Sequence, residues 1–382
     1  MPHTSFRALP IRLAALGVSI AATLTVGICS AAQADAASPG GGGAAARADA
    51  TPMSSTATLS PEAAAAGRAA HGAKATQLQS LEAYWTPARM RAAIPADRDP
   101  ALQASATQYA ASERQAAQQG KKLPTNDGPV RTAPGAASKV FTAQAGGVTA
   151  AYNPNLPYYT PTAYTAGKVF FTQNGLNYVC SGTIINSEGK DTVWTAGHCV
   201  HGGRGGTWHT NWSFVPAYDD DLANPRPYGT WYSAQLWAMT GWINNSDFSQ
   251  DFGVSIMQTR SGWHIVDYFG GQGLTVNRGK NVFENSFGYP AEWPYDGGNL
   301  MRCWGTTSPE WDVWFTWSQT VKISCDMTRG SSGGGWLYGY DGNWGYLNGV
   351  NSRIDRIVAP TIMLSPYFDD DAWTLHNATR YL

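Results

Sequence analysis

Short runs of apolar and β-branched residues, separated by glycine, asparagine and serine, make up most of the chain after residue 166. Runs of this length and composition are typical of strands in an all-β barrel or sandwich. The pattern predicts strands over residues 167–172, 178–185, 192–195, 212–215, 230–237, 253–258, 281–288, 320–323, 335–338 and 346–350. A helical pattern appears only over residues 368–381, so this part of the chain is predicted to be all-β with a C-terminal helix.

The first 34 residues have a different pattern. Arg7 and Arg12 precede an apolar run that extends to Ile28, and residues 32–34 read Ala-Gln-Ala. A positive flank, a short apolar core and an A-x-A site predict a cleavable signal peptide over residues 1–34. We therefore expect a secreted, extracellular protein. No other apolar run is long enough to span a bilayer, so we expect no membrane association after cleavage.

Residues 35–148 lack cysteine and show no recognisable chemistry. Residues 37–70 are rich in Ala, Gly, Ser and Thr and contain no aromatic residue, so they cannot bury enough apolar surface to offset their chain entropy. They are expected to be disordered. Apolar residues between 77 and 119 predict short helices, broken at Pro87, Pro95 and Pro100. The region is either a linker or a propeptide.

Composition narrows the class of protein. The formal net charge is −1 and the sequence pI is about 6.6, which gives no reason to expect a nucleic-acid partner. Only 14% of residues are charged, whereas Gly and aromatic residues are abundant, as in strand-rich exported domains. Four cysteines remain after signal cleavage, which suggests two disulfides with three possible connectivities: Cys180, Cys199, Cys303 and Cys325.

The candidate chemistry lies in three short motifs. Residues 330–334 read GSSGG, and a serine between glycines can sit on a tight turn with backbone N–H groups facing open space. Residues 195–199 read TAGHC and residues 251–254 read DFGV, which add an imidazole and a carboxylate. The chain order His, Asp, Ser is one of the known orders of a catalytic triad.

Each residue of the predicted triad has a distinct role. Ser332 would be the nucleophile, His198 the base that takes its proton, and Asp251 the group that orients the imidazole. The backbone N–H groups of Gly330 and Ser332 would form the oxyanion hole. Asp247 is an alternative acid. We favour Asp251 because apolar residues follow it into a predicted buried strand, which lowers the local dielectric.

TAGHC, DFGV and GSSGG, in this order, closely resemble the motifs of trypsin-like (chymotrypsin-fold) serine peptidases, in particular exported bacterial ones. The resemblance covers about residues 152–382 and implies two six-stranded antiparallel β-barrels, the first ending near residue 265, with the active site between them. It implies a peptidase domain over residues 149–382 that cleaves peptide bonds through an acyl-enzyme. Protein or peptide substrates, a monomer, no cofactor and no metal ion are expected.

The family resemblance also suggests the disulfides. Cys180 and Cys199 stand where the family has a disulfide that closes the loop behind the catalytic histidine. Cys303 and Cys325 would close a second loop just before the serine turn. Both disulfides would brace segments that carry the predicted triad.

Two departures from the family pattern matter. Ser331 stands where trypsin-like zymogens carry an aspartate that pairs with the freed N-terminal amine, so that switch cannot operate here. Latency, if the protein has any, must then come from a pro-segment that covers the cleft. Exported hydrolases need control until they leave the cell, so we favour a propeptide over residues 35–148, largely disordered with short helices.

The glutamyl-endopeptidase branch also lacks that aspartate, and the chain has some likeness to it. That branch has a histidine on the wall of its specificity pocket, where this chain has Asn351. Ser352 matches the family serine that hydrogen-bonds the catalytic aspartate. Asp326 lies six residues before Ser332, the spacing of trypsin's pocket-floor carboxylate, and a buried carboxylate there would select Arg or Lys. Alternatively, Asp326 is a structural turn residue after Cys325.

We expect two further features to be surface structure. His201 has no cluster of further ligands near it in sequence, so we expect a surface histidine rather than a metal ligand. The aspartate runs 219–221 and 369–371 are expected to be solvated loops, because three adjacent carboxylates do not present ligands at the alternate positions of calcium loops.

Two other functions fit part of the pattern. Residues 330–334 also match G-x-S-x-G of esterases and lipases, which need an acid and then a histidine after the serine. Only His376 follows, next to residues 369–371, and the flanks of the serine read as strands. A catalytically inactive secreted binding protein of the same fold is the third alternative, for example one that binds carbohydrate through its many Trp residues.

Overall fold

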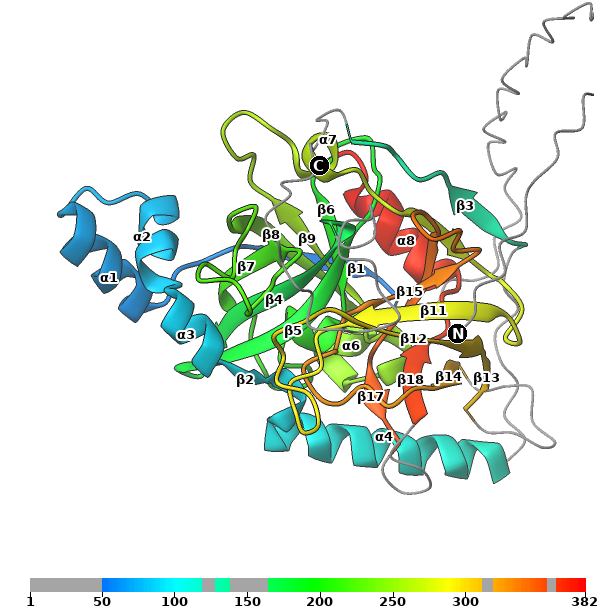
Figure 1. Cartoon of the computed structure of the whole chain (residues 1–382). Coiled ribbons are helices and arrows are strands. Elements are labelled where there is room, and N and C mark those ends of the chain that lie inside the picture. Colours follow the sequence, from blue (N-terminus) through cyan, green and yellow to red (C-terminus); the bar gives the residue numbers. More distant parts are fainter. Residues whose placement is uncertain (1–49, 119–127, 138–163, 311–318, 356–361) are drawn as a thin grey trace, which may run out of the picture. The chain divides into compact units, whose positions relative to one another are not determined.

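The computed structural model describes residues 50–118, 128–137, 164–310, 319–355 and 362–382 (Figure 1). The predicted signal peptide over residues 1–34, and the predicted start of the peptidase domain at residue 149, lie outside these ranges. Within these ranges, no helix combines the length and the apolar character needed to cross a membrane.

Six antiparallel strands form a closed barrel. They pair in the order β4-β5-β6-β9-β8-β7 and back to β4, and these are the strands predicted between residues 167 and 258. Their bounds are β4 (Ala166–Gln173), β5 (Leu176–Ile184), β6 (Thr192–Thr195), β7 (Thr210–Pro216), β8 (Trp231–Met239) and β9 (Gly253–Met257). The predicted six-stranded first barrel is confirmed, and its last strand, β9, ends at Met257.

The strands that follow lie in two further sheets. One sheet has the order β12-β11-β15-β16-β10-β3, and the other has the order β13-β14-β18-β17. Among the described residues, the second predicted barrel is therefore divided between two sheets, which the disulfide Cys303–Cys325 joins. Their bounds are β3 (Val130–Thr132), β10 (Gly273–Val276), β11 (Phe283–Gly288), β12 (Met301–Thr306), β13 (Ser308–Pro309), β14 (Thr320–Ser324), β15 (Gly335–Tyr338), β16 (Tyr346–Val350), β17 (Arg353–Ile354) and β18 (Ile362–Pro366).

Short helices connect the strands, and one longer helix follows them. The short ones are η2 (Gly197–Cys199), α6 (Thr240–Asn245), η3 (Phe248–Gln250) and α7 (Ile265–Phe269). The predicted C-terminal helix is confirmed as α8 (Asp370–Thr379). Asp369 caps α8 by accepting a hydrogen bond from the backbone N–H of Asp371, and Asp371 is buried against Gln250. The expectation of a solvated aspartate loop is wrong here, because these carboxylates satisfy a helix N-terminus and a buried amide.

The N-terminal segment is folded wherever the structure describes it. It contains β1 (Pro52–Thr56), α1 (Pro61–His71), α2 (Gln77–Tyr84), α3 (Pro87–Ala92), β2 (Ile94–Pro95), η1 (Ala96–Arg98) and α4 (Pro100–Gln118). The expectation of disorder is therefore wrong for residues 50–70. Pro87 and Pro100 begin helices instead of breaking them, since the first helical position needs no N–H.

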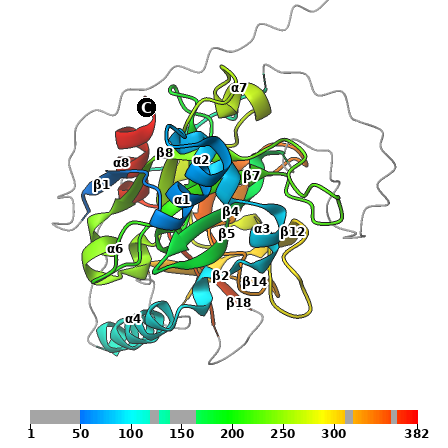
Figure 2. The ribbon, with the colours of Figure 1, turned by 90° about the vertical axis from the view of Figure 1, so that its left-hand side faces the viewer.

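Packing against the first barrel explains this order. Ala63, Leu81, Trp85 and Met90 are fully buried in the same hydrophobic core as the barrel residues, so the segment buries its few apolar side chains against the barrel rather than within itself. The Trp85 ring contacts Phe170 of β4, and helices α1 to α3 appear beside β4 and β5 in Figure 2.

Backbone pairing and side-chain hydrogen bonds extend this contact. β1 pairs antiparallel with β8, β2 parallel with β5, and β3 antiparallel with β10. Ser60 and Asn211 exchange two hydrogen bonds, of 2.8 and 2.9 Å, and the indole of Trp85 donates to the Asn211 carbonyl at 2.7 Å. Three sheet edges of the downstream domain therefore carry a strand from upstream of residue 133.

Candidate active site

His198 lies in the short helix η2, directly after β6, and neighbouring side chains fix this turn. The ring of His209 donates to the His198 carbonyl at 3.0 Å, and the Trp212 indole donates to the Cys199 carbonyl at 2.8 Å. The predicted disulfide Cys180–Cys199 ties the turn to β5. The turn that carries His198 is thus fixed by the disulfide of Cys199 and by two ring N–H donors, Trp212 in β7 and His209 directly before β7.

The imidazole of His198 meets the carboxylate of Asp251. Its Nδ1 lies 2.8 Å from Oδ2 of Asp251, and the His198 backbone N–H donates to Oδ1, also at 2.8 Å. Ser352 Oγ donates to Oδ2 at 2.6 Å, as its resemblance to the family serine implies. Both members of the His–Asp pair have side chains at most 1% exposed. The alternative acid, Asp247, accepts from the backbone and hydroxyl of Ser249 and caps η3 instead.

This environment makes His198 a stronger base. Burial by itself lowers its pKa, but the charge and hydrogen bond of Asp251, together with the charge of Asp97, outweigh burial and raise the pKa above its ordinary value of 6.5. Within the described part of the chain, Nε2 of His198 has no hydrogen-bond partner. The ring therefore has one nitrogen held by a carboxylate and the other available to take a proton.

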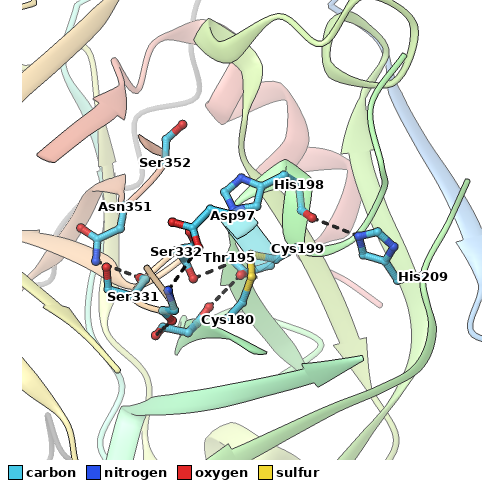
Figure 3. Close-up of a disulfide and its surroundings, with 12 residues drawn as sticks. Asp97, Cys180, Thr195, His198, Cys199, His209, Ser331, Ser332, Asn351 and Ser352 are labelled. Atoms are coloured by element: carbon cyan, nitrogen blue, oxygen red, sulfur yellow. Dashed lines mark hydrogen bonds between the residues drawn. A yellow bond between two sulfur atoms is a disulfide. The ribbon is translucent and has the colours of Figure 1, made fainter. Parts of the chain in front are cut away.

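The loop that carries Ser332 is bonded to the first barrel, next to His198 (Figure 3). The backbone N–H of Ser181 donates to the Ser332 carbonyl at 2.6 Å, and the Ser181 hydroxyl donates to the Gly330 carbonyl at 3.1 Å. Thr195 Oγ1 in turn donates to the Ser181 carbonyl at 2.7 Å. At Gly333, where φ is +81°, a Cβ would lie 2.0 Å from Thr195 Oγ1, so only glycine allows this approach.

Gly330 turns its backbone N–H toward the site with a φ of +96°. This N–H is one of the two predicted oxyanion-hole donors. It donates to Oδ1 of Asp97, from the N-terminal segment, at 3.3 Å. A carboxylate oxygen therefore lies at the position where the sequence predicts that a reacting oxygen would be bound.

Asn351 supports the serine loop from a fully buried position. Its side chain is fully buried and makes four hydrogen bonds, two accepted and two donated. It accepts from the Trp336 indole and the Ser286 hydroxyl, and it donates to the carbonyls of Phe287 and Ser331. The amide has no remaining capacity for a substrate, so its expected place on the pocket wall is corrected.

Asp326 and His201 also differ from expectation. Asp326 is exposed and accepts a hydrogen bond from Tyr295, so it is not the buried carboxylate of a pocket floor. His201 is only 5% exposed, accepts from the Gly203 backbone and packs edge-on against Trp208, so it is not a surface histidine. Burial lowers its pKa to about 4.

One group of possible metal ligands stands out among the described residues, namely Cys180, His198 and Cys199, with donor atoms within 4.8 Å of one another. Both sulfurs belong to the same disulfide. Zinc is bound by thiolates, which a disulfide does not provide, so this donor set does not fit a metal ion.

Two solved structures resemble the chain over nearly their whole length. The thermostable serine protease AL20 from an extremophilic microorganism is 34% identical, with a TM-score of 0.52, over 57% of this chain and 97% of that chain. The protease Anisep from Arthrobacter nicotinovorans is 36% identical, with a TM-score of 0.53, over 58% of this chain and 98% of that chain. No family model matches the sequence.

A curated relative matches more weakly. The extracellular metalloprotease of Bacillus subtilis (strain 168) is 26% identical over 132 residues, which are 35% of this chain. The match spans 38% of the length of that protein.

Taken with the closed barrel, the first two matches define the class: a protease that uses the chymotrypsin fold and acts on proteins or peptides. The chain belongs to the trypsin-like (chymotrypsin-fold) serine peptidases. The family predicted from the three motifs is confirmed.

Proposed function

We propose that the chain is a secreted serine endopeptidase in which His198, Asp251 and Ser332 form the catalytic triad. It would be made with a signal peptide over residues 1–34 and a propeptide over residues 35–148. The observation that carries the proposal is the environment of His198, whose Nδ1 is held by Asp251 while Nε2 has no partner among the described residues, next to the loop of Ser332.

The proposed reaction has two steps. Nε2 of His198 takes the proton of Ser332 Oγ as this oxygen attacks the scissile carbonyl, and the imidazolium then gives the proton to the leaving amine. Water attacks the resulting acyl-enzyme with the same histidine as base. The N–H groups of Gly330 and Ser332 would bind the oxyanion, and one such donor typically contributes about 2.7–4 kcal/mol. Asp251 keeps the imidazole in the required tautomer.

The strand that follows Ser332 and the position of His376 weigh against an esterase. Ser332 is followed by strand β15, which pairs antiparallel with β11 and β16, whereas the G-x-S-x-G elbow joins a strand to a helix in alternating β and α units. His376 is buried in α8 and packs against Trp373.

Substitution of Ser332 or His198 tests the proposal. We expect Ser332→Ala or His198→Ala to lower turnover of a peptide substrate by about 10⁶-fold, as in other triads. A fluorophosphonate probe should label the wild type and not Ser332→Ala. Ser324→Ala, at an exposed serine on β14, should be labelled like the wild type. Cleavage of an internally quenched peptide, blocked at both ends, would establish an endopeptidase.

Two outcomes would contradict the proposal. Residual proteolysis of Ser332→Ala within tenfold of the wild type would remove the nucleophile assignment, and an unlabelled wild type would favour the inactive binding protein. Since one relative carries the name metalloprotease, the activity of the wild type and of Ser332→Ala is also measured with a metal chelator present. Activity that a chelator abolishes and that Ser332→Ala retains would replace the serine mechanism with a metal-dependent one.

A further inference from the structure

The N-terminal segment enters the candidate active site along β5. In β2, Ile94 and Pro95 pair in parallel with Tyr178 and Val179, directly before the disulfide residue Cys180. The short helix η1 follows at once and directs Asp97 into the site. In Figure 3 the Asp97 side chain lies beside His198 and Ser332, and its Oδ1 accepts from the Gly330 N–H at 3.3 Å.

Contacts on both sides of Asp97 fix its position. Arg98 and Arg329 both pair with Glu292, at 2.9 and 3.0 Å, so one carboxylate joins the segment to the loop before Gly330. On the other side, Asp99 accepts from Gln173 of β4 at 3.3 Å and from the Ala101 N–H at 2.7 Å at the start of α4. Asp97 is thus held between two anchors.

Helix α4 continues over the neighbouring part of the site. Leu102 and Ala106 line one side of a pocket whose other side is formed by Phe248, Ser352 and Arg353. Ser352 is the residue that bonds Asp251, and Arg353 begins β17. The segment therefore covers both the Gly330 N–H and the surface beside Ser352.

We propose that residues 94–99 are a built-in inhibitor of the peptidase, in which the carboxylate of Asp97 occupies the oxyanion position at Gly330. This inference rests on the proposed function. The segment excludes a peptide substrate by filling the place of the reacting oxygen, while β2 occupies the edge of β5 and α4 covers the adjacent pocket.

The chemistry of a carboxylate suits this role. Oδ1 accepts from the Gly330 N–H at the place of a tetrahedral oxyanion, and it can do so in the ionised and in the protonated form. The carboxylate carbon is a poor electrophile because the charge is shared by both oxygens, so Ser332 has no reactive carbonyl at this position. The inhibitor is therefore bound without being cleaved there.

The charges around Asp97 make this contact dependent on pH. His198 faces it from η2, Arg329 from the loop before Gly330, and Glu292 from the loop after β11. Burial raises the pKa of Asp97 to about 6 from its ordinary value of 3.8, although the two cations oppose this. An acid whose pKa rises on docking takes up a proton, so docking is tightest at acid pH. It weakens as the pH rises from about 4 to about 6.

The test uses the full chain and a fluorophosphonate probe. Intact and processed species are separated on a denaturing gel after labelling, so that both labelling rates come from one sample. We expect the intact wild type to be labelled at least tenfold more slowly than the processed form. Intact Asp97→Ala should be labelled at a rate within threefold of that of the processed form. Glu82→Ala, at an exposed carboxylate of α2, should behave like the wild type.

A second variant and a second readout guard against misfolding. Asp97→Asn keeps the shape and an acceptor oxygen, so latency should remain but lose the change that Asp97 causes between about pH 4 and 6. In Ser332→Ala, which cannot process itself, amide hydrogen exchange at Gly330 should become at least tenfold faster when Asp97→Ala is added, and should not change with Glu82→Ala.

The outcomes separate this inference from the proposed function. If the intact wild type is labelled as fast as the processed form, or if Asp97→Ala leaves both the labelling rate and Gly330 exchange unchanged, the inhibitor is disproved and the serine peptidase stands. If neither species is ever labelled, it is the proposed function that fails.

Discussion

The Asp251 carboxylate accepts three hydrogen bonds, from the ring and the backbone of His198 and from Ser352. These contacts leave the imidazole one orientation, with Nδ1 toward the carboxylate. Asp251 therefore sets the position and the tautomer of the proposed catalytic base and contributes to its basicity.

The pH dependence of activity follows from this contact. Since a protonated imidazole cannot take the serine proton, kcat/KM should fall as the pH drops through the pKa of His198, to which the charge and hydrogen bond of Asp251 contribute an upward shift. We expect Asp251→Asn to move this acid limb to lower pH and to lower kcat by about 10⁴-fold. The measurement is kcat/KM against pH for both proteins. An acid limb at the same pH in both would show that Asp251 does not set the basicity.

The sequence identifies the residues that carry reactive groups and misses those that hold them. His198 and Ser332 are found because glycine, alanine and threonine around them form motifs. Ser181, His209 and Asp97 have no such signal, because each acts through hydrogen bonds to backbone groups outside its own local motif. The expected place of Asn351 on a pocket wall is wrong, because its four hydrogen-bond partners come from three separate parts of the chain, which a local sequence pattern does not contain.

At the scale of elements, the disulfide Cys303–Cys325 joins β12 to the end of β14, just upstream of the serine loop. Its closed loop has a sequence separation of 22 residues. In the chain-entropy model, a loop of this size stabilises the folded state by about 3 kcal/mol.

We expect the double variant Cys303→Ala and Cys325→Ala to lower the free energy of unfolding by about 3 kcal/mol, because the unfolded chain regains the loop entropy. Urea denaturation of the variant and the wild type measures this. A decrease below about 1 kcal/mol would mean that the two sheets are held together by packing alone.

Strands with a dense apolar pattern were predicted well, and short or interrupted strands were not. β4 to β9 match predicted runs closely, whereas β12 contains Arg302 and Gly305 and lacks alternation. β17 has only two residues, and its pairing with β18 depends on the surrounding sheet. Such residues form a strand because neighbouring strands pair with them, and the local sequence pattern carries no information on those neighbours.

At the scale of the whole molecule, the N-terminal segment shares its core with the first barrel. Its order could not be predicted from composition, because the alanine-rich stretch has too few apolar residues to fold alone. The missing apolar surface comes from the barrel, at Phe170 for example. The predicted propeptide boundary at residue 148 stays a prediction, while β3 adds residues 130–132 to the sheet of β10.

Trp85 tests whether the segment and the barrel fold as one unit. Its ring is fully buried, contacts Phe170 and donates to Asn211. In the Ser332→Ala chain, we expect Trp85→Ala to lower the free energy of unfolding by about 3–5 kcal/mol in a single transition. Urea denaturation followed by fluorescence measures this.

The matched control for this prediction is Trp293→Ala, at an indole that is 90% exposed. It should change the free energy of unfolding by no more than about 0.5 kcal/mol. Two separate transitions, with the barrel transition unshifted by Trp85→Ala, would show that the segment is only a loosely attached cover.

The hydrogen bond from Gly330 to Asp97 joins two parts of one covalent chain. While the tether is intact, the carboxylate competes with any substrate at an effective concentration on the order of millimolar or above. Cleavage of the chain between the two residues turns the same contact into a bimolecular equilibrium. The fraction of peptidase that still holds the cleaved segment then depends on the concentration of both products. Dilution after cleavage would then release the segment and complete activation. If cleavage took place in a small closed volume, the segment would stay bound and most molecules would remain inhibited.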